Sequence, residues 1–220
     1  MLLAGAMLLG LPLSSAQAGV DQDQMITRAF ATVQRVQVDR TFNRVLRDEL
    51  RHARGVLIIP SFYKAGLLLG GQGGSGVLLA HDPITGVWSY PIFQALIGGQ
   101  TGLRARFEGT AMLVIIRSVK GMNAVLRDDF RFGSKSGLTL LSLGSSLDAS
   151  PLAIQRADVI AYALGGAGAY GGIPLKGATL YPKDSWTSAY YGRPVEPKTV
   201  LFGKGVFNHQ ADALRHALAE

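Results

Sequence analysis

Basic side chains are the residues of this sequence whose type and position best fit a chemical task. Arginine has a planar guanidinium that donates two parallel hydrogen bonds to phosphate or carboxylate oxygens, and lysine supplies a compact positive charge. The chain carries 22 Lys and Arg against 15 Asp and Glu, a net charge of +7. This excess predicts an anionic partner, with improved solubility as the competing explanation. The candidate binding residues are Arg28, Arg35, Lys64, Arg104, Arg106 and Lys176.

Residue patterns that could support catalysis or metal binding fail on spacing or context. The chain has no cysteine, which removes disulfides, thiolate ligands and cysteine nucleophiles. His209 and His216 lie about two helical turns apart with no third ligand near them in the sequence. The adjacent Asp128 and Asp129 would point to opposite faces of a strand. We therefore predict a protein that is not an enzyme and that needs no cofactor or metal.

Two glycine segments match the dinucleotide-binding string G-x-G-x-x-G, one starting at Gly71 and one at Gly166. A dinucleotide site needs a helix directly after the glycines, because the helix N-terminus holds the pyrophosphate. Here the glycines are followed by VLLAHDPITG in the first case and by GIPLKG in the second. Both segments are interpreted as hairpins.

The glycine-rich stretch between Ala53 and Val77 organises the predicted sheet. Val56–Ile59 is a β-branched run, and Pro60 should end it because proline cannot donate to a strand ladder. Gly73-Gly74 lies between two apolar runs, which is the sequence form of a tight hairpin with positive φ angles. Glycines within strands also allow another chain segment to approach closely. The glycines assigned to structural turns are Gly70, Gly71, Gly73, Gly74, Gly76, Gly168, Gly172 and Gly177.

Residues 21–53 have a helical hydrophobic period, with arginines over much of the remaining surface. One apolar face consists of Ile26, Ala29, Phe30 and Val33. A basic amphipathic helix can lie in a membrane interface, and residues 21–37 would be the better interfacial segment. The alternative is a helix packed on the sheet with a solvated charged face, which the acidic residues of the same segment favour.

Short strands between turns dominate the remainder of the predicted fold. The predicted extended segments are 87–93, 103–107, 111–116, 138–143, 159–164 and 195–201. A short helix is predicted over 119–126, an aromatic turn over 185–191 and a closing helix over 209–218. In segment 103–107, Arg104 and Arg106 would share one solvated strand face. The pattern predicts a single α+β domain with a curved, mostly antiparallel, barrel-like sheet and helices toward both ends of the chain.

Five groups of residues, in this order along the chain, resemble one known family. They are ARGVLIIP, KAG and GGQGGSGV within residues 53–77, Gly86-x-Trp88-Ser89-x-Pro91, Ile97-Gly98-Gly99-Gln100-x-Gly102, the Gly168–Gly177 segment, and Ala189-Tyr190-Tyr191-Gly192. Together they are similar to the SYLF domain, a lipid-binding module of eukaryotic phosphoinositide- and actin-associated proteins and of bacterial exported proteins. The chain departs from the family pattern at Ala111, where an acidic residue is usual, and at LGSSLDASP, where a Gly-Pro turn is usual.

The resemblance implies a non-enzymatic module for anionic phospholipid or phosphoinositide-like headgroups at a membrane surface. It selects lipid, rather than another anion, as the partner of the basic residues. The alternative is a periplasmic structural or interaction protein that binds a protein of the cell envelope. We expect no nucleic acid partner, and actin is an implausible partner for an exported bacterial protein.

Residues 1–18 are interpreted as a secretory signal. An uncharged apolar run extends to Leu13 and is followed by Ala16-Gln17-Ala18, the form that signal peptidase accepts. The run falls short of the ~20 apolar residues that span a bilayer, although an uncleaved membrane anchor is the alternative. The expected product is 19–220, a periplasmic or secreted protein associated peripherally with membranes. Its expected parts are a helical segment 21–53, a glycine-rich β core 55–205 and a C-terminal helix 208–219.

Overall fold

The computed structural model of the protein describes residues 14–39, 42–64, 72–98, 110–128, 130–133, 138–143, 151–164 and 177–220. Within these ranges, nine strands form one sheet in the order β6-β9-β4-β2-β1-β5-β8-β7, and β3 pairs with β2. The strands are β1 (Gly55–Lys64), β2 (Gln72–Asp82), β3 (Val87–Trp88), β4 (Ile92–Gly98), β5 (Thr110–Ile116), β6 (Phe130–Arg131), β7 (Leu140–Leu143), β8 (Val159–Leu164) and β9 (Thr179–Pro182). The helices are α1 (Ser14–Val38), α2 (Phe42–His52), α3 (Val119–Val125), α4 (Pro151–Arg156), α5 (Asp184–Tyr191), α6 (Pro197–Phe202), the 3-10 turn η2 (His209–Ala211) and α7 (Asp212–Ala219).

The sheet is curled and almost wholly antiparallel. Among the described strands only β7 and β8 run parallel, and α4 lies in the connection between them, as a parallel pair requires. Most of the helical residues lie outside the strand region of the chain, with α1 and α2 before the strands and α5 to α7 after them, whereas the short helices α3 and α4 lie between strands. The prediction of an α+β domain with a curved, half-barrel antiparallel sheet is confirmed.

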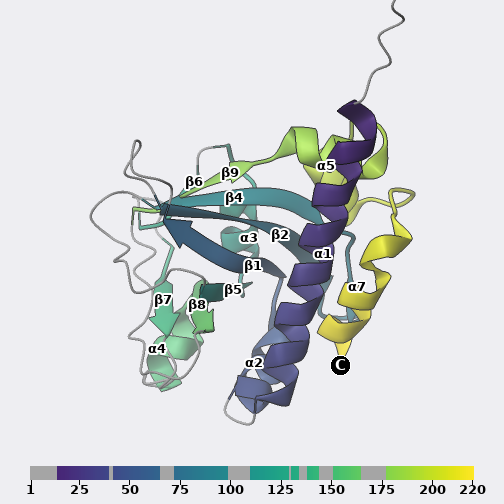
Figure 1. Cartoon of the computed structure of the whole chain (residues 1–220). Helices are drawn as coiled ribbons and strands as arrows, with labels where there is room; N and C mark the ends of the chain where they lie inside the picture. The colour runs from purple at the N-terminus through teal and green to yellow at the C-terminus, as the bar shows by residue number, and fades with distance from the viewer. Residues whose placement is uncertain are drawn as a thin grey trace, which may run out of the picture.

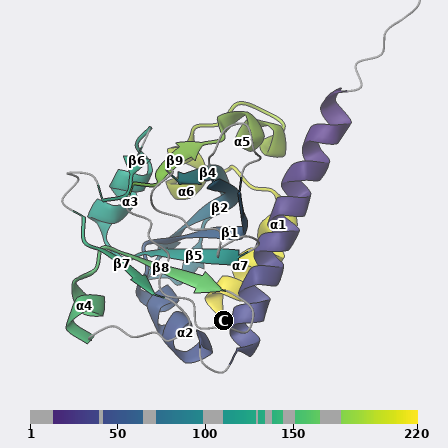
Figure 2. The same ribbon diagram turned by 60° about the vertical axis from the view of Figure 1, so that its left-hand side comes forward.

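The sheet has an apolar core on each face because its central strands are buried on both sides. Val56 and Ile58 contribute to a cluster under α1, α2 and α7, whereas Leu57 and Ile59 contribute to a cluster with α3 and α6. Figure 1 shows α1 and α7 side by side in front of the sheet, with α2 at its lower end. In Figure 2, α1 follows one side of the sheet and α3 lies on the other. The arginine-bearing helices therefore cover one face of the sheet.

The glycines at the start of β2 correct the predicted hairpin. Gly73 and Gly74 lie within the strand, paired with Ile97 and Leu96 of β4, and neither has a positive φ angle. The strand register between β1 and β2 shifts between Ile58 and Tyr63. At this irregularity β1 continues through Pro60, although the sequence predicted that it would end there. Gly76 also lies in β2, so the turn assignment fails for these three glycines.

The reason for these glycines is close packing against the irregular part of β1. A Cβ at Gly74 would lie 2.7 Å from Ile59 Cγ2 and 2.7 Å from Ser61 O. A Cβ at Gly76 would overlap the carbonyl oxygen of Ile58. Glycine is required here because a side chain would occupy the space that β1 fills. The prediction that strand glycines permit close approach of another segment is confirmed.

Several of the other predictions of secondary structure are confirmed, and two predictions near the C-terminus are wrong. The strands at 111–116 and 159–164, the helix at 119–126 and the closing helix are confirmed, with η2 as the first turn of the last. Segment 87–93 is broken into β3 and the start of β4 around Pro91. Segment 185–191 lies in the helix α5, and most of the helix α6 lies in segment 195–201, so both predictions are wrong. The predicted strand 103–107 lies outside the described residues.

Candidate functional site

The apolar face of α1 is part of the core. Ile26 and Val33 are each 3% exposed, and Phe30 is partly buried against the same cluster. These side chains would have to leave the core before they could enter a membrane. Arg28 and Arg35 lie on the solvent-exposed side of the helix, one heptad apart. The structure therefore shows the packed helix with a charged outer face, not a free amphipathic helix.

Helix α2 carries a row of exposed arginines that were not among the candidate binding residues predicted from the sequence. Arg44, Arg47 and Arg51 are exposed and follow i, i+3, i+7 spacing, which places them on one side of the helix. Leu46, on the opposite side, is 1% exposed and belongs to the core. We call these three residues the arginine row. Because the apolar side of α2 is fixed to the sheet, the three arginines stay on the exposed side of the helix.

A partly buried ion pair links α2 to the residue that follows β5. Arg117 Nε, just after β5, lies 2.9 Å from Glu49 Oε2, which is an ion pair rather than an aligned hydrogen bond. Burial raises the pKa of Glu49, and the Arg117 charge acts in the opposite direction. The same region buries the Tyr162 hydroxyl and raises the pKa of that phenol. Glu49 therefore fixes the orientation of α2 without occupying the arginine row.

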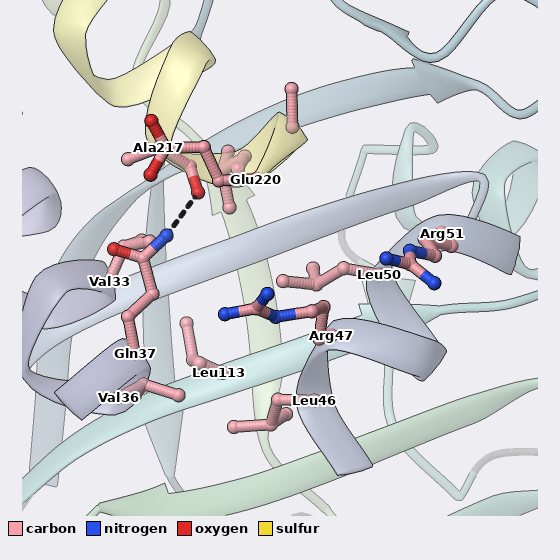
Figure 3. A pocket seen from close by; sticks show the side chains of 12 residues that line it. Val33, Val36, Gln37, Leu46, Arg47, Leu50, Arg51, Leu113, Ala217 and Glu220 are labelled. Atoms are coloured by element: carbon pink, nitrogen blue, oxygen red, sulfur yellow. Dashed lines mark hydrogen bonds between the residues drawn. The ribbon is translucent and has the colours of Figure 1, made fainter. Parts of the chain in front are cut away.

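A small pocket lies beneath the arginine row, between α1, α2 and α7. Val33, Val36, Leu46 and other apolar side chains line it, and Gln37 Nε2 donates a 2.7 Å hydrogen bond to Ala217 O beside it. Figure 3 shows Arg47 extending from α2 across this pocket toward α1. The cavity volume is about 30 Å³, which holds about two water molecules and no acyl chain. The surface around the pocket, rather than its interior, is the candidate site.

Comparisons with known proteins give the family. A family profile described as "Las17-binding protein actin regulator" (Ysc84) matches residues 97–220, which is more than half of the chain. The chain belongs to the Ysc84 family. This membership agrees with the SYLF resemblance of the sequence and places the chain in a family of binding domains.

Curated relatives of the Ysc84 family are longer than this chain. SH3 domain-containing YSC84-like protein 1 of Bos taurus is 27% identical over 167 residues, covering 76% of this chain and 48% of the relative. The human protein of the same name is 26% identical with the same coverage. LAS seventeen-binding protein 3 of Saccharomyces cerevisiae is 26% identical over 167 residues, covering 71% of this chain and 34% of the relative. The chain therefore spans about half, or less, of the length of these relatives.

Lys64 is the remaining basic candidate that the structure describes, and it lies at one end of the Ysc84-family sheet. Lys64 is the last residue of β1, and its backbone pairs with Gln72 at the start of β2. Segments 99–109 and 165–176 begin where β4 and β8 end, at the same end of the sheet, since Gln72 pairs with Gly98 and Ala111 pairs with Leu164. The structure thus separates Lys64 from Arg28 and Arg35, which lie on α1. The candidates outside the described residues are Arg104, Arg106, Lys176, Gly70, Gly71, Gly168 and Gly172.

The described part of the chain also bears on metal sites and membrane spans. No group of three His, Cys, Asp or Glu side chains within it could hold a metal ion. No helix in the described ranges combines the length and the apolar character needed to cross a bilayer.

Of the assigned turn glycines, Gly177 lies in a turn with φ of 86°. The arginine row had a sequence signal, the i, i+3, i+7 spacing, although its three residues are not among the candidate binding residues predicted from the sequence.

Proposed function

We propose that this chain is a non-enzymatic module that binds anionic lipid headgroups at a membrane surface through the arginine row. The observation that supports it is the fixed presentation of Arg44, Arg47 and Arg51 on one side of a helix whose other side is held by the core. Arg28 and Arg35 add positive charge to the outer side of α1. Guanidinium groups suit this task because they bond phosphate oxygens in pairs.

The packing of α1 determines which mode of membrane binding is proposed. Its apolar residues are already buried, so insertion would require the helix to leave the sheet and expose the core. Binding through charge requires no such change, and each basic residue near an anionic surface contributes about 1 kcal/mol. The proposed association is therefore peripheral, and it should weaken as salt shortens the Debye length from about 10 Å at 0.1 M to about 3 Å at 1 M.

The proposal includes the location of the protein. Residues 1–18 retain the features of a secretory signal, and cleavage after Ala18 would shorten α1 without touching Ile26 or the other described core residues of that helix. The proposed product is exported and meets membranes from the periplasmic or extracellular side. Intact mass of protein from the envelope fraction tests this step, and a mass that retains Met1–Ala18 refutes it.

Flotation with phosphatidylcholine vesicles, with and without phosphatidylglycerol, tests the arginine row. The double variant Arg44→Gln, Arg51→Gln should lose about 2 kcal/mol of binding free energy, roughly a thirtyfold loss of affinity. The matched control is Arg127→Gln, Arg156→Gln, which removes the same charge from exposed residues after α3 and at the end of α4. Equal weakening by the two double variants would mean that net charge alone governs binding.

The same assay separates the arginine row from the candidates Arg104 and Arg106. The variant Arg104→Gln, Arg106→Gln removes two charges from the segment that follows β4. If the arginine row forms the main contact, this variant should bind vesicles as the charge-matched control does. A thirtyfold loss in this variant, with the α2 variant unaffected, would move the lipid site to the glycine-rich end of the sheet.

A further inference from the structure

A second concave surface lies beyond the end of β2, at the opposite end of that strand from Gly73 and Gly74. It is a groove between β3, with the turn before it, and the chain from α6 to η2, and its volume is about 800 Å³. Its floor contains His81 and Trp88, and its rim contains Val87, Phe202 and Phe207. We call it the aromatic groove. Its volume lies within the range of about 300–1,000 Å³ that is typical of ligand sites.

The rim of the aromatic groove exposes large apolar side chains. Val87 is 55% exposed, Phe202 57% and Phe207 60%. Ile84, in the adjoining turn, is 92% exposed. Single exposed apolar residues are ordinary on protein surfaces, but several around one groove mark an interaction site.

The floor of the groove is held by stacking between its own two rings and by contacts to two other parts of the chain. The rings of His81 and Trp88 stack with centroids 4.4 Å apart and an interplanar angle of 20°. His81 Nδ1 lies 3.0 Å from the carbonyl oxygen of Ala53, which can only accept, so this nitrogen carries the proton. Arg215 Nε donates a 2.9 Å bond to Trp88 O, and its guanidinium lies 4.0 Å from the centroid of the Tyr90 ring. A floor fixed in this way needs little ordering when a ligand binds.

The polar groups around the groove leave one cationic side chain available to a ligand. The Asp82 carboxylate accepts hydrogen bonds from Ile84 N and Thr85 Oγ1 within its own turn. Asp212, beneath the groove, accepts from Tyr90 and Arg215 and lies 2.7 Å from a ring nitrogen of His209. Lys204 lines the groove, is exposed and has no hydrogen-bond or ion-pair partner among the described residues. Lys204 is thus a cation that a ligand carboxylate can reach, whereas the Asp82 carboxylate, which keeps its negative charge, is held by donors of its own turn.

We propose that the aromatic groove binds an extended peptide segment of a partner protein, in which bulky apolar side chains lie beside a carboxylate. The apolar side chains would occupy the space between Phe202, Phe207 and the Trp88 floor, and the carboxylate would pair with Lys204. Aromatic residues are enriched where interfaces derive most of their binding energy. This site is separate from the arginine row and does not depend on the lipid proposal.

The shape of the site favours a peptide over a membrane. His81 and Trp88 are 9% and 2% exposed and lie at the bottom of a concave surface. A flat bilayer would contact only protruding side chains such as Ile84 and Phe207. A peptide side chain can enter the groove and contact the floor. The recessed aromatic floor is therefore the feature that a peptide uses and a bilayer does not.

Selection from a library of short random peptides displayed on phage tests the proposal. The full chain is the target, and the Phe207→Ser variant serves for counter-selection. We expect enrichment of sequences that place Asp or Glu next to bulky apolar residues. A synthetic copy of the most enriched peptide should bind the wild-type chain and weaken about tenfold or more with Phe207→Ser and with Lys204→Glu. The matched control is Tyr181→Ser, which removes an exposed aromatic side chain from β9.

Each other outcome overturns the proposal. The melting temperature of Phe207→Ser should equal that of the wild type because the side chain is largely exposed, which excludes unfolding as the cause of lost binding. No enrichment, or peptides that bind Phe207→Ser equally well, would refute the peptide site.

Loss of vesicle flotation with Phe207→Ser would assign the groove to a bilayer. A wild-type dimer that dissociates in this variant by light scattering would assign it to a second copy of the chain. The Arg44→Gln, Arg51→Gln variant should retain peptide binding, so failure of one proposal leaves the other testable.

Discussion

Strand β2 has glycines near its start and another glycine in the turn after its end, and the two environments differ. At the start, Gly74 and Gly76 lie under the irregular part of β1, where a Cβ at Gly74 would be 2.7 Å from Ser61 O. After the end, Gly86 has φ of 71°, and a Cβ there would have no atom within 4 Å. The first set is needed for space, and Gly86 is needed for its backbone conformation.

This difference separates two properties of glycine that a sequence cannot distinguish. A close contact penalises any side chain, whatever its preferred backbone angles. A left-handed backbone penalises most L-residues but accepts asparagine at lower cost. Substitutions at the two ends of β2 should therefore differ in size and in which residue restores stability.

The largest effect is expected for Gly76→Ala. The new Cβ would overlap Ile58 O and lie 2.9 Å from Ile59 Cγ1, in a central strand that cannot move freely. Overpacking of this kind should lower the free energy of unfolding by about 3 kcal/mol, measured by urea denaturation. Gly73→Ala is the control, because the nearest atom to its Cβ would be Leu96 O at 3.1 Å, a contact that a small shift relieves. Equal losses for the two variants would contradict the packing explanation.

A smaller effect is expected for Gly86→Ala. The methyl group has open space, so the cost is that of a left-handed backbone for an L-residue, about 1 kcal/mol. Gly86→Asn should recover part of this loss in the same urea measurement. Gly76→Asn should recover nothing, because its cost is steric. Recovery by asparagine at Gly76 would mean that the start of β2 is a turn after all.

Long apolar runs made much of the fold predictable from the sequence. β5 and β8 were predicted because a continuous apolar run identifies a strand buried on both faces. The helices α5 and α6 were missed because each is too short to show a helical period, and α5 is rich in aromatic residues. Local signals were present nevertheless: Gly192 caps α5 with φ of 66°, and Pro197 begins α6. The two helices were missed because the predictions gave more weight to residue composition than to the capping residues.

The candidate surfaces were less predictable because they depend on contacts between distant segments. The exposure of Arg28 and Arg35 follows from the period of α1. The aromatic groove joins residues near Trp88 to residues near Phe207, a separation in sequence that no local pattern connects. The bulge of β1 over Gly74 was hidden for the same reason, since a Gly-Gly pair fits a hairpin turn and a close contact equally well. Surfaces built within one helix could be predicted, and surfaces built across the sheet could not.

The smallest expected effect concerns pH at the end of β2. The Asp82 carboxylate accepts from Ile84 N at 3.0 Å and from Thr85 Oγ1 at 2.9 Å. These hydrogen bonds favour the ionised form and lower the pKa of Asp82 below its usual value. Because the folded pKa lies below the unfolded one, the stabilisation is complete above the usual aspartate pKa and is lost as pH falls through the folded value.

The amide resonance of Ile84 should therefore titrate with a midpoint below that of an ordinary aspartate, whereas the amide of Gly76 should not change over the same range. Asp82→Asn keeps an oxygen acceptor and should abolish the titration at Ile84 while leaving the turn intact. A midpoint at the ordinary value, or an equal change at Gly76, would show that the two ends of β2 do not differ in how they respond to charge.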